Sequence, residues 1–365
     1  MATAAPARDS FRRSLRKWVE DSVRPHAARW ERAGQFPRAT LAECARRGYF
    51  ALSANDGYTL AEEIARCDSL GFALSVFLQA NLIAPMLEEL GTPEQKQAYL
   101  KPLLNGRKFG CMAVSEPGAG SDFAALETEA KPTRDSVLLT GTKTYITNAA
   151  LADFAIVAAR ITGAQAGVVS LFVVPLDAGV RVKRLATLGL RTSAAGTIEL
   201  RRCRVPAANL LGTAGEAFAY IQRGLNRERL FGGIAAVSWA EYAMERTMAF
   251  ARQRQAFGQT ISRFQAIRHQ FADMATRLEA ARQLNRTTFD RWAGGENVTL
   301  EICMLKLFTY QVAQDVITSC LQLHGGLGYT DDHWSSRYYR DARALTIAAG
   351  TPEVMRDLIA AYLRV

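Results

Sequence analysis

The spacing of apolar residues changes twice along this chain of 365 residues, which limits what it can fold into. In residues 1–109 and 214–365, apolar side chains recur at the spacing of amphipathic helices. Residues 110–213 instead carry short apolar or β-branched runs, such as Val168 to Val174, separated by Gly, Pro, Asp and Asn. The sequence therefore predicts an α+β multidomain fold, with an N-terminal helical domain (1–109), a central β-sandwich or barrel (110–213) and a C-terminal helical bundle (214–365).

Local patterns predict where helices begin. Thr92-Pro93-Glu94-Gln95 combines an N-cap residue, a proline suited to the first turn and a glutamine that completes a capping box. Near the N-terminus, a basic stretch resembles a transit peptide. Phe11 and Leu15 recur there at helical spacing, so we expect a first helix starting near Arg8 rather than a transit peptide.

Composition argues against several classes of protein. Hydrophobic residues make up 49% and charged residues 22% of the chain, which argues against global disorder. No apolar run is expected to reach the roughly 20 residues of a membrane-spanning helix, and the longest candidate lies around Phe231 to Val237. The net charge is +10, but Lys and Arg are dispersed, so nucleic acid is not an expected partner.

The six cysteines form no C-x-x-C pair and there are only four histidines, so neither a metal site nor a disulfide framework is expected. The cysteines are expected in the core, and a reducing cytoplasm is the expected location.

Five short segments could bind a ligand, although each also has a plain structural explanation as a turn, strand end or helix end. Glycines let a backbone approach a ligand closely, an exposed aromatic ring can cover a planar cofactor, and arginine or a helix N-terminus can bind a phosphate. The first segment is not a G-x-G-x-x-G motif, so it does not indicate a Rossmann fold. The five segments are 115–122, 145–148, 252–265, 322–329 and 350–353.

In their order and spacing these segments resemble the acyl-CoA dehydrogenase superfamily, over the chain from residue 8 to its end. The resemblance implies an N-terminal helical domain, a central β-domain and a C-terminal four-helix bundle, with FAD bound non-covalently between the last two. The motifs that carry it are AVSEPGAGSD at 113–122, YIT at 145–147, RQAFGQ at 254–259, LQLHGGLGY at 321–329 and YRDAR at 339–343.

The resemblance also implies which residues bind FAD, and Tyr145 would cover the flavin. Within one subunit, the expected contacts are Met112, Val114, Ser115, Gly120, Ser121, Tyr145, Ile146, Thr147, Thr351 and Glu353. Expected contacts to the FAD of a neighbouring subunit are Arg254, Gln265, Gln322, Leu323, Gly325 and Gly326, and Phe257 of the same motif is expected to bind the cofactor as well. A site shared in this way implies an oligomer, a homotetramer or a homodimer.

The implied reaction is α,β-dehydrogenation of an acyl thioester, in which a carboxylate removes the α-proton and the β-hydrogen leaves as hydride to flavin N5. Many family members carry the base in an E-G-T motif, where this chain has Ala349-Gly350-Thr351. In the isovaleryl-CoA and long-chain branches the base lies at the position of Glu228, which is therefore the expected base. The alternative is a surface glutamate paired with an arginine.

Four further residues are expected to bind the substrate. Arg229 would steady the base, and the amide of Ala349 would donate to the thioester carbonyl. Gly350 follows it in the same loop, and Ser121 would lie near the CoA arm of the thioester.

Departures from the family leave the thioester carrier open. The stretch 52–58 is shorter than the family's PEEYGG-like segment, Asn226 replaces a common acid, and Pro352 replaces a Ser or Ala. The expected substrate is therefore acyl-CoA, or the same acyl group on an acidic acyl-carrier protein. A flavin monooxygenase and a non-catalytic subunit are further alternatives. An electron-transferring flavoprotein is the expected electron acceptor, and the acyl chain is not determined.

Overall fold

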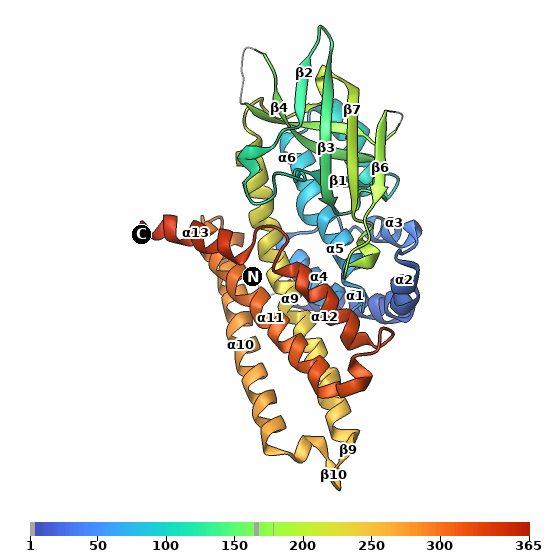
Figure 1. The fold of residues 1–365 in the computed structure, drawn as a ribbon, viewed down its shortest axis with the longest axis vertical. Coiled ribbons are helices and arrows are strands. Elements are labelled where there is room, and N and C mark those ends of the chain that lie inside the picture. Colours follow the sequence, from blue (N-terminus) through green and yellow to red (C-terminus); the bar gives the residue numbers. More distant parts are fainter. Residues whose placement is uncertain (1–3, 164–167, 178) are drawn as a thin grey trace.

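The computed structural model describes residues 4–163, 168–177 and 179–365, and it has a helical part, a sheet and a second helical part in chain order. In Figure 1 the sheet lies at one end of the long axis and the small hairpin β9–β10 at the other. The N-terminal helices lie beside α9 below the sheet. This arrangement agrees with the predicted fold class, while the domain boundaries at 109/110 and 213/214 stay predictions.

The N-terminal part is a set of short helices whose apolar faces form one core. Leu60 and Ile64 of α4, and Cys67 just after it, are all buried. All six cysteines are buried and none forms a disulfide, as expected. The elements are α1 (Ala4–Trp18), η1 (Val19–Val23), η2 (Arg24–His26), α2 (Ala27–Ala33), α3 (Arg38–Arg46), α4 (Ala54–Ile64), α5 (Leu70–Leu78), η3 (Gln79–Ile83), α6 (Ala84–Leu90), α7 (Pro93–Gln95), η4 (Lys96–Leu100) and α8 (Lys101–Leu104).

The expectation that no apolar run reaches the length of a membrane-spanning helix is wrong. The elements α5, η3 and α6 follow one another without a break over Leu70–Leu90, which by length and composition could cross a membrane. In the fold, however, 89% of its most apolar window is buried inside the protein. A lone helix of this kind is what the core of a large helical domain also contains, because a helix surrounded by protein is apolar all round.

The helix start predicted at Thr92 is confirmed, and α1 begins at Ala4, before the expected start near Arg8. Thr92 accepts a hydrogen bond from the amide of Gln95 while the Gln95 side chain accepts from the amide of Thr92, so the capping box is complete. Thr351 caps α13 by accepting from the amide of Val354. The shortened stretch 52–58 is mostly helical, because Ser53 caps α4 by accepting from the amide of Asp56.

The β-region forms one mixed sheet with the strand order β6-β7-β3-β2-β4-β5-β8, and β1 pairs in parallel with β4. The predicted apolar run Val168 to Val174 lies in β5 from Val169 onward. The strands are β1 (Gly110–Ala113), β2 (Glu129–Pro132), β3 (Ser136–Ile146), β4 (Phe154–Ile161), β5 (Val169–Pro175), β6 (Val180–Arg184), β7 (Gly196–Pro206) and β8 (Leu210–Leu211), with short turns η5 (Phe123–Ala125), η6 (Arg191–Ser193) and η7 (Ala207–Asn209).

The C-terminal part is built on three long helices that pack against each other, with α12 on α11. The pair Gly294-Gly295 follows the end of α10 and lies in the turn before α11. In Figure 1, α13 projects away from the bundle. The elements are α9 (Ala217–Gln253), β9 (Gln255–Ala256), β10 (Gln259–Thr260), η8 (Ile261–Arg263), α10 (Gln265–Ala293), α11 (Thr299–Gly328), α12 (Trp334–Leu345) and α13 (Pro352–Leu363).

The loop between β6 and β7 joins the sheet to both helical parts. At Gly71 in α5 an added Cβ would lie 2.3 Å from Thr192 Oγ1, so only glycine permits this contact. At Gly189 a Cβ would lie 2.3 Å from the carbonyl oxygen of Arg340 in α12. The amide of Leu190 donates to the buried Asp341 carboxyl at 2.6 Å. These close contacts hold the sheet at a set position above the bundle.

Candidate active site

Glu228 lies in α9, one residue before the fully buried Arg229. Glu228 is partly buried, and its carboxyl makes no hydrogen bond or ion pair with any residue that the structure describes. Burial raises the pKa of Glu228, and the positive charges of Lys306 and Arg229 act in the opposite direction. A carboxylate poorly solvated and without a partner is a stronger base than one in water, so its lone pairs are available to an acidic C–H.

Arg229 connects α9 to the loop before α13. Its side chain is 2% exposed, and Nε donates to the carbonyl oxygen of Ala349 at 2.9 Å. Nη1 donates to Oδ1 of Asn226 at 3.2 Å. The Asn226 side chain also donates to Thr299 Oγ1 at 3.1 Å, so it helps hold Arg229 in place. Arg229 and Ala349 are thus brought together although 120 residues separate them, and Glu228 is the neighbour of Arg229 in α9.

The loop at Ala349 and Gly350 has an unusual backbone. Ala349 has φ +55° and Gly350 has φ +103°, a region that favours glycine. A Cβ at Gly350 would lie 3.2 Å from Arg229 Nη2 and 2.8 Å from Met355 Cε, so the site has no room for a side chain there. The amide of Ala349 has no acceptor among the described residues. This loop therefore offers a free N–H close to Arg229.

Two residues that the sequence analysis did not single out belong to the same cluster. Lys306 in α11 is 3% exposed, and its Nζ donates to the carbonyl oxygen of Leu345 at 3.2 Å. Burial and the charge of Arg229 lower the pKa of Lys306 to about 7, and Glu228 opposes this. The hydroxyl of Tyr310, one turn further along α11, donates to the carbonyl oxygen of Arg229 at 3.2 Å. A lysine inside an apolar helical stripe was the available signal.

The loop after β1 and the end of β3 lie side by side. The amide of Thr144 donates to the carbonyl oxygen of Ser115 at 2.9 Å. Beneath the loop, Nζ of the buried Lys143 donates to Glu116 at 2.7 Å and to the carbonyl oxygen of Val114 at 2.9 Å. Hydrogen bonds to Lys143 lower the pKa of Glu116 against the effect of its burial. This buried ion pair, which sequence reasoning missed, holds the loop in place.

Tyr145 shows that this surface fits a planar cofactor. The register of β3 against β7 shifts between Lys143 and Ile146, and Tyr145 adopts φ +60° with 72% of its surface exposed. At Gly120, in the neighbouring loop, an added Cβ would meet no atom within 4 Å, so space is open there. A strained backbone that directs an aromatic ring into water is stabilised when a flat ring system covers it. The residues present therefore fit a flavin.

The predicted residues of this surface have different exposures. Val114 and Ile146 are buried and support it, and Met112, Ser115 and Thr147 are partly buried. Gly120, Ser121 and Tyr145 are exposed. Thr351 and the exposed Glu353 lie at the start of α13, next to the loop that Arg229 holds. Their contacts to FAD stay predictions.

A second group of predicted cofactor residues lies at the opposite end of the molecule. Arg254 and Phe257 lie at the hairpin β9–β10, which Figure 1 shows farthest from the sheet, and Gln265 begins α10 beside it. Phe257 is 95% exposed and has φ +51°. One chain therefore does not bring these residues to the Tyr145 surface.

The remaining four residues of that group lie in the last turns of α11. The ring of His324 stacks on Phe250, near the end of α9, at 4.3 Å between ring centroids, which places this segment close to the hairpin. The backbone there is kinked at Gly325, with φ +57° and ψ −140°. The residues are Gln322, Leu323, Gly325 and Gly326, of which only Leu323 is partly buried and the other three are exposed.

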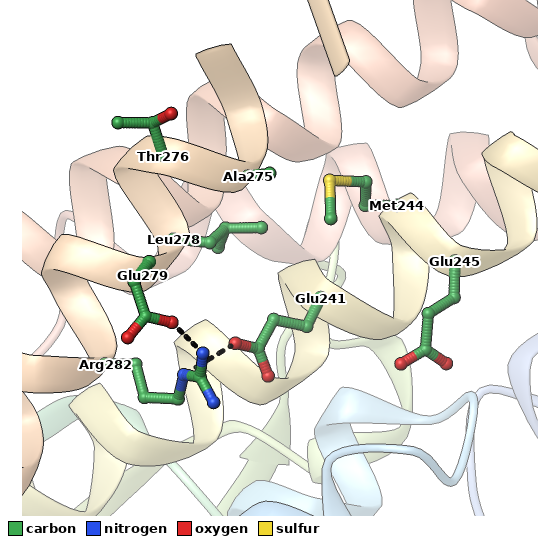
Figure 2. Close-up of a pocket in the computed structure, with 8 residues that line it drawn as sticks. All are labelled: Glu241, Met244, Glu245, Ala275, Thr276, Leu278, Glu279 and Arg282. Atoms are coloured by element: carbon green, nitrogen blue, oxygen red, sulfur yellow. Dashed lines mark ion pairs between the residues drawn. The ribbon is translucent and has the colours of Figure 1, made fainter. Parts of the chain in front are cut away.

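A groove of about 680 Å³ lies elsewhere, between α9 and α10. Figure 2 shows Arg282 between Glu279 and Glu241, with which it forms ion pairs. Burial raises the pKa of Glu241, and Arg282 opposes this. Glu241 lies about 20 Å further along α9 than Glu228, at the 1.5 Å rise per residue of a helix. The groove is therefore separate from the Glu228 cluster.

Comparisons with known proteins place this arrangement in a family. The family models for the acyl-CoA dehydrogenase N-terminal, middle and C-terminal domains match residues 5–107, 111–203 and 215–363. The chain is 31% identical to the mitochondrial long-chain specific acyl-CoA dehydrogenase of Sus scrofa, over 96% of this chain and 85% of that protein. It is 35% identical to the short-chain specific enzyme of the same organism, over 97% of this chain and 89% of that protein.

Solved structures of similar proteins have the same fold as this chain. An acyl-CoA dehydrogenase from Geobacillus kaustophilus superposes with a TM-score of 0.93 at 32% identity, covering 98% of each chain. The prolyl acyl carrier protein oxidase AnaB superposes with a TM-score of 0.92 at 27% identity, covering 98% of this chain and 99% of that one. The chain therefore belongs to the acyl-CoA dehydrogenase family and is an FAD-dependent oxidoreductase.

Proposed function

We propose that this protein catalyses α,β-dehydrogenation of an acyl-CoA, with Glu228 as the base that removes the α-proton. The observation that carries the proposal is the Glu228 carboxyl, which is partly buried, has a raised pKa because of that burial, and has no hydrogen-bond or ion-pair partner among the described residues. The other reading, a surface glutamate paired with an arginine, is disfavoured because Arg229 donates to Ala349 and Asn226 instead. Ala349 carries no carboxylate, so it cannot compete with Glu228 for the role of base.

The chain's own residues would act on the thioester in two ways. Glu228 would take the α-proton, so the C–H electron pair moves toward the thioester carbonyl. The amide of Ala349, held by Arg229, would donate to that carbonyl oxygen where negative charge develops. Bound FAD would accept the β-hydrogen as hydride at N5, which completes the two-electron oxidation.

Residues at two surfaces would hold FAD. Tyr145, Thr147 and the loop 115–121 would lie against the flavin, with Lys143 and Glu116 supporting the loop. Arg254, Phe257 and Gln265 would bind the FAD of a neighbouring subunit, because they lie at the far end of their own chain. The enzyme would therefore work as a homotetramer or homodimer. An electron-transferring flavoprotein would reoxidise the flavin.

A carrier-protein thioester is the second candidate substrate. The chain carries a net charge of +10, which suits an acidic carrier protein. AnaB, which shares the fold, is named an acyl carrier protein oxidase. Turnover of loaded carrier protein that falls steeply with salt, together with weak turnover of free acyl-CoA, would favour this substrate.

The test is anaerobic bleaching of the flavin by acyl-CoA esters. The wild-type holoenzyme should lose its yellow absorbance on mixing, and Glu228→Gln should slow the bleaching by about 10²- to 10⁴-fold, the usual contribution of a general base. Bound FAD should be retained. Glu241→Gln is the matched control, since it removes a carboxylate with a raised pKa from the same helix outside the site.

Two results would contradict the proposal. Normal bleaching by Glu228→Gln would show that another group removes the proton. A yellow wild-type enzyme that no acyl thioester bleaches, on CoA or on carrier protein, would remove dehydrogenation as the function. An equal loss in Glu241→Gln would attribute the effect to a disturbed helix.

A further inference from the structure

On the face of α9 that carries Glu228, a glycine lies one turn before Glu228 and another lies one turn after it. Gly224 and Gly232 lie four residues before and after Glu228, and residues so spaced share one face of a helix, about one turn apart. Glycine weakens a helix interior relative to alanine, so two such residues need a reason. The reason is close approach, because at each of them another side chain occupies the place of the missing Cβ.

On one side that side chain is Leu82. Leu82 belongs to η3, is buried, and its Cδ1 lies 2.5 Å from where a Cβ of Gly224 would be. Met86, one turn later, reaches the same point with its sulfur at 3.6 Å. The segment Gln79–Leu90 therefore closes the Glu228 face of α9 one turn toward the N-terminus of that helix.

On the other side the side chain is Tyr310. Its hydroxyl oxygen lies 2.2 Å from where a Cβ of Gly232 would be, and it donates to the carbonyl oxygen of Arg229. The Tyr310 ring lies against Lys306, whose Nζ is 4.2 Å from the ring centroid. Tyr310 is thus held at its hydroxyl and at its ring. It closes the face of α9 one turn beyond Glu228.

We infer that Leu82 and Tyr310 restrict the acyl group beside Glu228 to a short chain. The inference rests on the proposed function, since it assumes that the acyl group lies against Glu228. With both sides closed within about one helical turn, 5.4 Å, a long chain has no path along α9 without displacing a buried side chain. A short chain would place its α-carbon at the carboxylate without displacing either side chain.

The test is a chain-length series on the holoenzyme. The wild-type kcat/KM should be highest for butyryl-CoA and fall by about tenfold or more for octanoyl-CoA, since added methylenes that do not fit cost that much. Leu82→Ala and Tyr310→Ala should each raise the octanoyl-to-butyryl ratio by about tenfold. Kd values for the 2-enoyl-CoA products of both lengths, from calorimetry, should change in the same direction, which separates binding from chemistry.

Two controls and the contrary results complete the test. Leu103→Ala makes the same substitution in the core between α8 and α3, so it should lower stability without changing the ratio. Tyr310→Phe keeps the ring and should keep the short-chain preference. Octanoyl-CoA turned over as well as butyryl-CoA by the wild type, or an unchanged ratio in both Ala variants, overturns the inference. Bleaching by no acyl-CoA would instead defeat the proposed function, and the inference with it.

Discussion

The cluster around Glu228 and the surface around Tyr145 differ in how complete they are within one chain. Around Glu228, the supporting groups Arg229, Lys306 and Tyr310 are buried and hydrogen bonded to neighbours in the same chain. Tyr145 instead presents a ring that is 72% exposed. Phe257, in the hairpin at the opposite end of the molecule, is 95% exposed.

The difference separates two physical tasks. A base needs a fixed, poorly hydrated environment, because its basicity depends on burial and on nearby charges. A cofactor as large as FAD needs surface, and a surface split between distant elements is completed only by a second chain. Variants in the first region should therefore change the chemistry, and variants in the second should change cofactor binding and assembly.

Apart from replacing Glu228 itself, the largest effect is expected from Arg229→Met. Without the guanidinium, the Ala349 carbonyl loses its donor, and the loop that carries the Ala349 amide should move. A displacement of about 1 Å at a reacting group can cost about 10²-fold in rate, so we expect that loss in the anaerobic reduction rate with FAD retained. Arg229→Lys should recover part of kcat. An unchanged kcat would show that the loop is held without Arg229.

Tyr145→Ala should act on the cofactor. Stacking of aromatic rings contributes about 0.5–1.5 kcal/mol beyond area burial, so the Kd of FAD should rise by up to about tenfold. The melting temperature of the apoprotein should not change, because the ring is largely exposed. The measurement is FAD titration by fluorescence quenching. A large loss of apoprotein stability would mean that Tyr145 belongs to the core rather than to a binding surface.

Lys306→Met should shift the pH profile. Protonated Lys306 lowers the pKa of Glu228, so its removal should move the acidic limb of kcat/KM to higher pH, by about one unit or less. The direction in which stability changes with pH follows from the pKa of Lys306, which is lowered to about 7. Between pH 7 and about 10.4 the unfolded chain binds more protons, so wild-type stability should rise with pH there, and the variant should lose this slope. If the acidic limb of kcat/KM stays at the wild-type pH, Lys306 does not influence the pKa of Glu228.

Phe257→Ser should have the smallest effect within one chain, because the side chain is 95% exposed. Its melting curve as an apoprotein should match that of the wild type. If a second chain uses Phe257, FAD affinity should fall by a few-fold and the dimer or tetramer should weaken, which sedimentation velocity would measure. Wild-type affinity and assembly in this variant would restrict the cofactor site to the Tyr145 surface.

Much of the fold was predictable because its signals are local. The change from helical to strand spacing is visible within each segment of the sequence. The capping box at Thr92 and the cap at Thr351 each depend on residues within one turn. The exception is Leu70–Leu90, whose apolar length the sequence analysis overlooked and whose burial depends on the packing around it. Glu228 was predicted as the base from a resemblance. The structure shows its position in α9, while its role stays a prediction.

The site's surroundings were not predictable in the same way. Lys143 and Glu116 form a buried pair across 27 residues, and Tyr310 reaches Arg229 across 81. No spacing rule links such distant positions. Gly224 and Gly232 show the same point, because their lack of a side chain has meaning only once Leu82 and Tyr310 lie against them.

The sequence by itself determined the order of helical and strand regions, the helix starts and the residue types available for chemistry, because these depend on neighbours along the chain. Only the tertiary structure decided which of them meet. It placed the carboxyl of Glu228 where burial raises its pKa, held Ala349 with Arg229, and left Tyr145 exposed. The reason is physical: desolvation, electrostatic fields and the volume left for a ligand are properties of packed surfaces, and these surfaces come from segments far apart in the chain.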